Sequence, residues 1–425
     1  MIPQRHRPWR VALVVIAAIV FQALVVGLAG AQLTSGPPPT PVPPDGSLSP
    51  FPQVLHTPSD AMAPPEVSAA SATLATLDDG QVLYAKEPDT QRPIASLTKI
   101  MTGLLTLERS DPADVVTVAP DAVVPEAGRE GVSTLGVQAG ERISVGDLLY
   151  ALLLQSANDA AVALADHVAG SEPRFVKMMN ARARAIGMRH TRFRSPNGLD
   201  DRGFSTARDL VTLTRGAMAL PGFASIVATE FHTVPAPEGP ARDIQNRNAL
   251  LWLYPGATGV KTGFTSRAGY CVVATAERDG RRLVAVILGG GSDVFSQAAE
   301  LLNYGFAAFT QHTFVTAGGS NGVVALPGGS VAVEAAAGLE ALVPTASLEA
   351  IDEQVVTDPR AAYPPAPGER VASLKVTIPG LTIGRVPLVV SSVPAPPPID
   401  DRPWWERAAA AVLEAIRSGV RAATD

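Results

Sequence analysis

A serine followed three residues later by a lysine is the first candidate for chemistry in this chain of 425 residues. Ser96 and Lys99 lie in the segment PIASLTK, at the predicted start of a helix. One helical turn places residues i and i+3 on the same face, and a helix N-terminus presents amide dipoles that stabilise a developing anion. The serine can therefore act as a nucleophile beside the lysine as its base, provided that burial or a second cation favours the neutral amine.

Two further motifs supply groups that such a pair needs. Ser156 and Asn158 form an SxN motif on the turn between two predicted helices, where a hydroxyl and an amide can relay a proton and hold a substrate amide. Lys261, in the segment VKTG, adds a second lysine just before a predicted hairpin. Ser195-Pro196-Asn197 has the same SxN spacing, but its proline suits a loop, so the helical context favours Ser156.

The order of these motifs is more specific than any one of them. An SxxK is expected about once by chance in a chain of this length, and its plain interpretation is an N-cap serine with a solvated lysine. SxxK, SxN and KTG in this order are the signature of penicillin-interacting serine enzymes.

The chain resembles the low-molecular-weight penicillin-binding proteins, the serine-type D-alanyl-D-alanine carboxypeptidases of bacterial walls. The resemblance runs from about Val67 to Val390 and includes, besides the three motifs, residues 197–200, 205–210, 245–248 and 259–265. It implies an α/β domain of the β-lactamase and penicillin-binding type, in which helices flank an antiparallel sheet and form a helical subdomain, followed by a small all-β sandwich domain. It implies no cofactor.

The resemblance also assigns roles in catalysis. Ser96 would attack the carbonyl of the penultimate D-alanine with Lys99 as general base. Ser156 would relay a proton to the leaving amine, and Asn158 would position the substrate and Lys99. The oxyanion hole would consist of the backbone amides of Ser96 and Phe264.

The terminal carboxylate of the substrate is expected to bind near the second lysine. Lys261 would keep the local field positive, the Thr262 hydroxyl would bind the carboxylate, and Gly263 and Phe264 would line the site. The family usually has an arginine soon after the late glycine-rich strand end, but here no arginine follows Gly289–Asp293 before Arg360. Carboxylate binding then depends on Lys261 and Thr262, with Arg247 or Arg267 as candidate clamps.

Two hairpins and the helices between them must position these residues. Asp79-Gly80 and Asp279-Gly280 supply tight turns for a hairpin over residues 72–85 and another over residues 271–288. Strands near both ends of the domain predict a sheet that late strands close. Helices are expected at residues 97–108, 145–154, 159–168, 174–185, 207–217 and 295–309.

Composition divides the chain into six segments. Proline-rich stretches act as semi-rigid spacers, and short strands broken by glycine and proline indicate a small β domain. We expect 1–31 to be a signal peptide or membrane anchor, 32–66 a linker, 67–312 the penicillin-binding serine peptidase domain, 313–392 the β-sandwich, 393–403 a second linker and 404–425 an amphipathic tail helix.

The N-terminal segment predicts an extracytoplasmic location. Arg5, Arg7 and Arg10 precede Val11–Ala31, which carries no formal charge, so the chain after it is exported. Ala29-Gly30-Ala31 is a cleavage site, whereas the length of the apolar run also suits a retained anchor; both remain open. Tryptophans and arginines in the tail helix suit a membrane surface, and the alternative is a tail helix with no partner.

Charge and residue counts exclude several classes of partner. The net charge of −6 and the lack of dense basic clusters argue against nucleic acid. Six scattered histidines and a single cysteine predict no metal site and no disulfide. Cys271 is expected to be buried and inert. The expected partners are the peptidoglycan stem peptide, β-lactam antibiotics as covalent inhibitors, and the membrane surface.

Other functions remain alternatives. An endopeptidase that cuts D-alanyl crosslinks would use the same residues, and an inactive wall-binding module would only hold peptide. A class A β-lactamase needs a glutamate for fast deacylation, and only Glu172 lies between Ser156 and Asn197. Gly318–Gly322 is a literal GxSxG, but a β-like segment follows it, which argues against an α/β-hydrolase.

Overall fold

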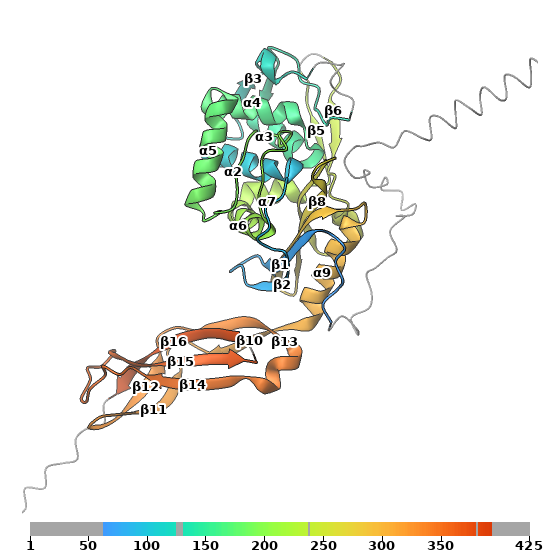
Figure 1. Cartoon of the computed structure of the whole chain (residues 1–425). Coiled ribbons are helices and arrows are strands. Elements are labelled where there is room, and N and C mark those ends of the chain that lie inside the picture. The colour runs from blue at the N-terminus through green and yellow to red at the C-terminus, as the bar shows by residue number, and fades with distance from the viewer. Residues whose placement is uncertain (1–62, 125–130, 237–238, 380, 393–425) are drawn as a thin grey trace, which may run out of the picture. The chain divides into compact units, whose positions relative to one another are not determined.

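The computed structural model describes residues 63–124, 131–236, 239–379 and 381–392 (Figure 1). The chain divides after Ala308 into two compact units, which are treated separately below. The N-terminal apolar segment, most of the first proline-rich linker, the second linker and the tail helix lie outside the described residues. Within those ranges no single helix has the length and apolar composition to cross a membrane, although one bent pair, Ala207–Met218 with Pro221–Ala228, meets these two criteria.

A five-stranded antiparallel sheet forms the base of the first unit. Its order is β2-β1-β9-β8-β7, so the first hairpin is completed by strands that come much later in the chain, as the sequence predicted. β1 pairs with β9 from Ser71 opposite Leu288 to Thr76 opposite Leu283. The strands are β1 (Ser71–Thr76), β2 (Val82–Lys86), β7 (Ala257–Thr265), β8 (Gly269–Arg278) and β9 (Arg281–Gly290).

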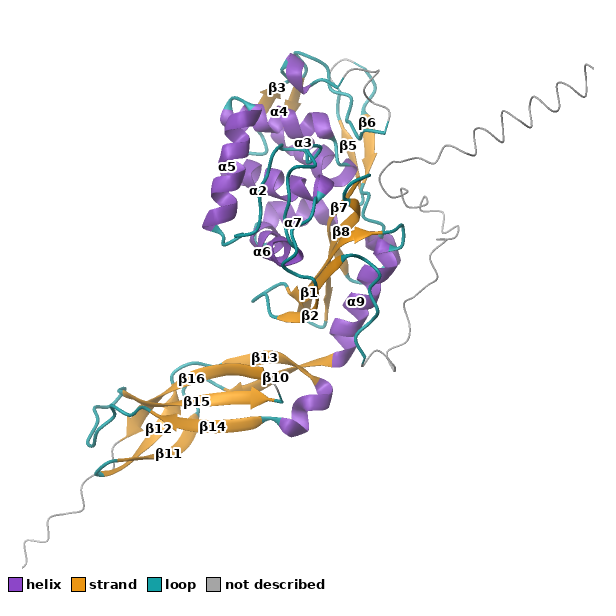
Figure 2. Cartoon of the chain, viewed as in Figure 1, coloured by secondary structure: helices purple, strands orange, loops and turns teal. Residues whose placement is uncertain are grey.

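Helices cover both faces of this sheet, which explains its apolar strands. Every residue of β1 is buried, and β8 and β9 each have six consecutive buried residues. A strand covered on both faces shows a continuous apolar run and no alternation. Helix α9 (Val294–Ala308) packs on β8 and β9, whereas α6 (Ala207–Met218) packs on β1 and β9 (Figure 2).

The helical subdomain surrounds α2 (Lys99–Arg109). This helix contacts α4, α5, α6 and α7, and its residues from Lys99 to Thr106 are all buried. The lysine of SxxK therefore starts a helix that lies in the centre of the domain. The other helices are α3 (Val145–Tyr150), α4 (Asn158–Ala169), α5 (Glu172–Ala185), α7 (Pro221–Ala228) and α8 (Leu250–Leu253). Two short strand pairs accompany them: β3 (Val115–Thr117) pairs with β4 (Arg142–Ser144), and β5 (Phe231–Val234) pairs with β6 (Arg242–Gln245).

Three helices differ from the sequence prediction, and one of them is the short α8, which was not predicted. The helix expected at residues 145–154 changes after Tyr150 to a π-helical turn, Ala151–Gln155. Helix α7 was not predicted, because Leu220-Pro221 follows α6 directly and a proline normally marks the end of a helix. Here Pro221 occupies the first turn of the new helix, where its missing N–H costs nothing.

Over its described residues, 309–379 and 381–392, the second unit consists of strands apart from one 3-10 turn at Thr345–Ala350. One sheet has the order β11-β12-β16-β15-β14, and β10 pairs with β13; Val315 of β10 joins the apolar core of the larger sheet. The strands are β10 (Phe309–Val315), β11 (Ser320–Leu326), β12 (Gly329–Ala335), β13 (Leu339–Pro344), β14 (Asp352–Thr357), β15 (Arg370–Ile378) and β16 (Leu381–Ser392). The sequence pattern predicts strands at residues 322–326, 330–334, 371–378 and 384–390, but not β10, β13 or β14. Strand β14 is exposed at every residue and so lacks apolar alternation.

Candidate active site

Ser96 and Lys99 meet where a 3-10 turn, Ala95–Thr98, leads into α2. The Lys99 Nζ lies 2.9 Å from the Ser96 Oγ. Ser96 is half-buried and Lys99 is fully buried, so the hydroxyl is accessible to a substrate and the amine is not. The structure thus places a nucleophile and a base in hydrogen-bonding contact.

Three oxygen atoms surround the Lys99 amine. Besides the Ser96 hydroxyl, Nζ donates to the Asn158 Oδ1 at 2.8 Å and to the Asn197 carbonyl at 2.7 Å. A neutral amine has two N–H groups and one lone pair. When the two asparagine oxygens accept both N–H groups, the lone pair points at the Ser96 hydroxyl and can accept its proton.

Burial makes the neutral form of the Lys99 amine well populated near neutral pH. Burial, followed by the charge of Arg247, lowers the pKa of Lys99 from 10.5 to about 7, against an opposing contribution from Asp159. A general base is most effective when its pKa is close to the working pH. Lys99 therefore meets the condition that the sequence motif alone left open.

Asn158 has its orientation fixed by the loop that precedes β4. Its Nδ2 donates to the Ser133 carbonyl at 2.9 Å, and its backbone N–H donates to the same oxygen at 2.8 Å. The neighbouring Asp159 carboxylate accepts N–H groups from Leu135 at 2.9 Å and from Gly136 at 2.8 Å. With Nδ2 held by Ser133, the Oδ1 is directed to Lys99.

Ser156 lies between the π-helical turn and α4 in the left-handed backbone region, at φ +66°. Its side chain is buried, and among the described residues its hydroxyl makes no hydrogen bond. It stands two residues before Asn158, the direct partner of Lys99. A left-handed serine is uncommon and is typical of a backbone that its surroundings constrain.

The Asn197 carbonyl is a site group that the sequence did not reveal. Ser195-Pro196-Asn197 forms a loop, as its proline predicted, yet it reaches Lys99 through the backbone. Gly198 follows at φ +84°, and a Cβ there would lie 2.0 Å from the Ala95 carbonyl. Only glycine lets the loop come this close to the turn that carries Ser96. The one available signal was the Asn-Gly pair, which marks a tight turn but does not say what it contacts.

Strand β7 forms the opposite wall of the site. Lys261 and Thr262 are buried. A Cβ on Gly263 would lie 3.0 Å from the Ser96 backbone nitrogen, so the strand passes directly beside the nucleophile. The half-buried Phe264 has its ring centroid 4.5 Å from that of Tyr270. Since β7 ends the order of its sheet, its outer backbone groups remain for a ligand.

The site carries an excess of positive charge. Burial, followed by the charges of Lys99 and Arg247, lowers the pKa of Lys261 well below its usual value. Burial also lowers the pKa of Arg247. Its backbone N–H donates to the Leu154 carbonyl at 3.1 Å, whereas Arg267 is exposed. The structure therefore favours Arg247 over Arg267 as the cation that acts with the two lysines.

The Thr262 hydroxyl completes an anion-binding arrangement. It is buried and has no hydrogen-bond partner among the described residues. A buried polar atom without a partner costs free energy unless a ligand satisfies it. Lys261 precedes Thr262 in β7 and is within electrostatic range of Lys99 and Arg247, so an anion is the ligand that suits this hydroxyl.

The base strength of Lys99 should depend on Arg247. In the wild-type protein we expect kcat/KM to rise with pH through about 7, because the neutral amine is the active form. Arg247→Gln removes a cation that lowers the pKa of Lys99, so the rise should move to higher pH, and KM for a peptide carboxylate should increase about tenfold. Arg267→Gln is the matched control. A pH profile that is the same in both variants would contradict the role of Arg247.

Several other sequence candidates lie outside this arrangement. Burial raises the pKa of the Cys271 thiol to about 11, so it is protonated and unreactive at neutral pH. Ser320 of the GxSxG segment begins strand β11, and a nucleophile elbow would need a helix there. In the described ranges no group of three or more His, Cys, Asp or Glu side chains is arranged to hold a metal.

Comparison with known proteins gives a consistent result for the first unit. A family model described as D-alanyl-D-alanine carboxypeptidase matches residues 58–292. D-alanyl-D-alanine carboxypeptidase DacC of Escherichia coli is 34% identical over 351 residues, which cover 77% of this chain and 84% of that one. DacB2 of Mycobacterium tuberculosis is 39% identical, over 59% of this chain and 86% of that one. The match to DacF of Bacillus subtilis, at 32% identity, covers 57% of this chain and 64% of its length.

Solved structures with the same fold include both units of the chain. Penicillin binding protein 5 from Haemophilus influenzae superposes with a TM-score of 0.65 at 29% identity, over 77% of this chain and 98% of that one. Penicillin binding protein 6B from Escherichia coli gives a TM-score of 0.63 at 31% identity, over 78% of this chain and 98% of that one.

One sequence relative has a different activity in its name. A D-alanyl-D-alanine endopeptidase of Pseudomonas aeruginosa is 36% identical over 56% of this chain and 76% of its own length.

Proposed function

The chain belongs to the D-alanyl-D-alanine carboxypeptidase family of serine peptidases, and from this premise we propose that it removes the terminal D-alanine from peptidoglycan stem peptides. One observation carries the proposal. The buried Lys99 amine, with a pKa of about 7, lies 2.9 Å from the Ser96 hydroxyl and is held by two asparagine oxygens. This arrangement prepares a serine for attack on a carbonyl carbon.

Acylation follows from the geometry. The Ser96 Oγ attacks the carbonyl carbon of the penultimate D-alanine and gives its proton to the Lys99 Nζ. The backbone N–H groups of Ser96 and Phe264 stabilise the oxyanion, since β7 passes beside the Ser96 nitrogen. The C–N bond then breaks, and the proton passes from Lys99 through the Ser156 hydroxyl to the leaving amine. D-alanine leaves, and Ser96 carries the acyl group.

Deacylation reverses these roles with water as the nucleophile. Lys99 accepts a proton from the water, the hydroxide attacks the ester carbonyl, and the proton returns to the Ser96 Oγ as the C–O bond breaks. A β-lactam that acylates Ser96 would follow the same first step, and its ring-opened product would stay attached if the water is excluded. Among the described residues, Glu172 makes no hydrogen bond to Ser96 or Lys99.

The substrate carboxylate is proposed to bind at Lys261, Thr262 and Arg247. The peptide lies extended along the free edge of β7 and adds main-chain hydrogen bonds there. This places the carboxylate of the last residue at the Thr262 hydroxyl and the preceding carbonyl at Ser96. The charges of Lys261 and Arg247, with Lys99 acting as the neutral base, favour a substrate with a free C-terminus.

Loss of the Thr262 hydroxyl should weaken carboxylate binding. Thr262→Val keeps the shape of the side chain, and we expect kcat/KM for a peptide ending in D-Ala-D-Ala to fall roughly 10- to 100-fold because a charge-assisted hydrogen bond is lost. Thr73→Val is the matched control: the Thr73 hydroxyl is also buried without a partner, but it lies in β1. Equal activity of the two variants would show that the Thr262 hydroxyl does not bind the substrate carboxylate.

The location proposed for this reaction is outside the cytoplasm. A relative of this chain is a D-alanyl-D-alanine carboxypeptidase, whose substrate type we place in the cell wall, and the segment before residue 32 has the charge pattern of an export signal. We propose that the peptidase unit acts at the outer face of the cytoplasmic membrane, at the end of the proline-rich linker over residues 32–66.

The direct test uses the purified full chain and two substrates. Free D-alanine from a linear peptide that ends in D-Ala-D-Ala measures the carboxypeptidase, and cleavage of a D-alanyl crosslinked dimer measures the endopeptidase that one relative's name suggests. For a dimer crosslinked through a lysine side chain, which has no carboxylate beside the scissile amide, we expect the linear peptide to be preferred by at least about tenfold. Cleavage of the dimer alone would assign the endopeptidase. Capture of penicillin without cleavage of either substrate would mean that the chain binds penicillin but is not a peptidase.

A further inference from the structure

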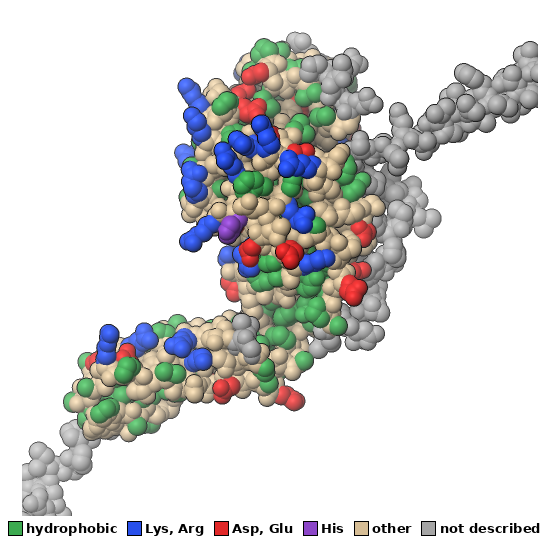
Figure 3. Space-filling model, viewed as in Figure 1, with side chains coloured by type: hydrophobic (Ala, Val, Ile, Leu, Met, Phe, Trp, Pro, Cys, Tyr) green, Lys and Arg blue, Asp and Glu red, His purple; other side chains and the backbone are tan. Residues whose placement is uncertain are grey.

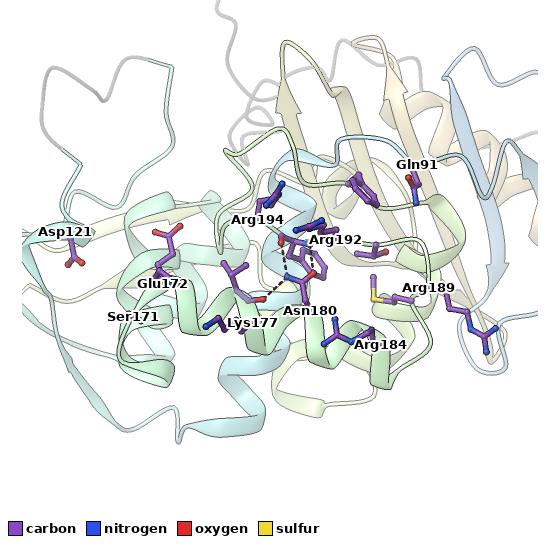
Figure 4. Close-up of a pocket in the computed structure, with 16 residues that line it drawn as sticks. Gln91, Asp121, Ser171, Glu172, Lys177, Asn180, Arg184, Arg189, Arg192 and Arg194 are labelled. Carbon is purple, nitrogen blue, oxygen red and sulfur yellow. Dashed lines mark hydrogen bonds between the residues drawn. The ribbon is translucent and has the colours of Figure 1, made fainter.

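A groove of about 1050 Å³ lies on the helical subdomain, between α5 and the segment at residues 188–194 (Figure 4). Five cationic side chains line it: Lys177, Arg184, Arg189, Arg192 and Arg194. All five are exposed. The chain as a whole has a net charge of −6, so this concentration of positive charge is local.

The five cations are available to a ligand. Two other arginines of the first unit are paired: Arg182 donates to Glu108, and Arg208 pairs with Asp89. No ion pair within the described residues involves any of the five groove cations. Blue side chains gather over this region of the first unit in the space-filling view (Figure 3).

Acidic side chains limit the groove at one end. Figure 4 shows Asp121 and Glu172 together at the end opposite Arg189. An anionic ligand is therefore attracted by the basic side chains and repelled by the acidic ones, so it should bind at the basic end of the groove.

The groove is continuous with the loop that contacts Lys99. Arg192 and Arg194 also line a second small cavity together with Ala95 and Gly198. The backbone of Arg192 is held by Phe204 through hydrogen bonds of 2.8 and 3.0 Å. Five residues after Arg192, the Asn197 carbonyl accepts from the Lys99 Nζ. One segment thus carries three groove cations and one wall of the catalytic pocket.

We propose that this groove binds carboxylate-bearing wall strands, so that a neighbouring stem peptide of the polymer is held there while another is cleaved at Ser96. The proposal rests on the proposed function, which defines the polymer. Every uncrosslinked stem peptide ends in a carboxylate, so a wall strand presents this group repeatedly. Arginine forks bind carboxylates in a planar, bidentate way, and several such contacts on one polymer add through effective concentration.

The test measures binding in the full chain carrying Ser96→Ala, kept soluble in mild detergent, so that the polymer stays intact. The groove variant is Lys177→Glu with Arg184→Glu, two exposed positions on α5 that touch no catalytic group. The matched control is Arg109→Glu with Arg142→Glu, which changes the net charge equally at exposed positions outside the groove. Lys177→Gln with Arg184→Gln repeats the test without added acids.

The probe is isolated peptidoglycan with free stem-peptide carboxylates, measured by co-sedimentation at low and high salt. We expect Kd to increase about fivefold or more in the charge-reversal variant, less in the glutamine variant and within about twofold in the control, with the difference lost at high salt. Peptidoglycan whose carboxylates have been converted to amides should bind all variants equally weakly. Equal binding by the groove and control variants would overturn the proposal, as would undiminished binding of the amidated polymer, which would point to wall phosphate.

Activity separates this proposal from the function of the active site. With Ser96 intact, the groove variant should release D-alanine from a short peptide within about twofold of the wild-type rate, while KM for the polymer increases. If the wild-type chain releases no D-alanine but the binding difference persists, the catalytic proposal fails and the groove stands. If cleavage is normal and the polymer KM is unchanged, the groove proposal alone fails.

Discussion

Ser96→Ala is expected to abolish both D-alanine release and covalent capture of penicillin. The Ser96 Oγ is the atom that forms the acyl bond, and removal of a serine nucleophile leaves only the residual effect of binding and oxyanion stabilisation. The loss in kcat should be at least about 10⁴-fold. Release of D-alanine measured by an oxidase-coupled assay, together with gel detection of fluorescent penicillin, checks both steps.

The control for this variant is another serine at the edge of the site. Ser133 contacts Asn158 through its backbone carbonyl, so Ser133→Ala removes a hydroxyl without removing that contact. It should keep activity within a few fold. A Ser96→Ala protein that has the same unfolding temperature as the wild type, and is therefore folded, but still releases D-alanine would refute the acyl-enzyme mechanism.

Lys99→Met is expected to produce the second largest effect, a loss of at least about 10³-fold in the acylation rate. Methionine fills a similar buried volume but has neither the lone pair that accepts the Ser96 proton nor the N–H groups that bind Asn158 and Asn197. The rate of penicillin capture measures acylation without the deacylation step. This variant should therefore bind penicillin slowly at every pH and show no rise through about pH 7.

Lys99→Arg distinguishes a base from a fixed charge. Arginine keeps the positive charge but stays protonated at any pH that the protein tolerates. If Lys99 acts as a base, the arginine variant should be as slow as the methionine variant. Acylation at near wild-type rate in the arginine variant would mean that the positive charge alone is required, and the proton would then need another acceptor.

The sequence predicted the parts of the site whose geometry is local. Ser96 and Lys99 are three residues apart at a helix start, and such a spacing brings the two side chains together whatever surrounds them. Asn158 could be chosen over Asn197 as the side-chain ligand because SxN lies between helices. The closure of the sheet by β8 and β9 was also predictable, since their apolar runs are long and a turn signal separates them.

Contacts between distant segments were not predictable. Asn197 reaches Lys99 through a carbonyl, a group that every residue carries, so its type gives no signal. Arg247 was one of two candidate clamps, and only the folded chain shows that it influences both lysines while Arg267 is exposed. The groove cations come from α5 and from a loop, and in the sequence they are indistinguishable from solvated surface residues.

The glycines on either side of Ser96 limit how this protein can evolve under antibiotic pressure. A mutation that narrows the entrance would be a simple way to exclude a bulky β-lactam and still admit a slender peptide. At position 198 the added carbon would collide with the Ala95 carbonyl, and at position 263 it would press on the Ser96 nitrogen. Both contacts involve the backbone next to or at Ser96, so a side chain added at either position would require that backbone to shift, and we expect such a change to cost peptidase activity as well.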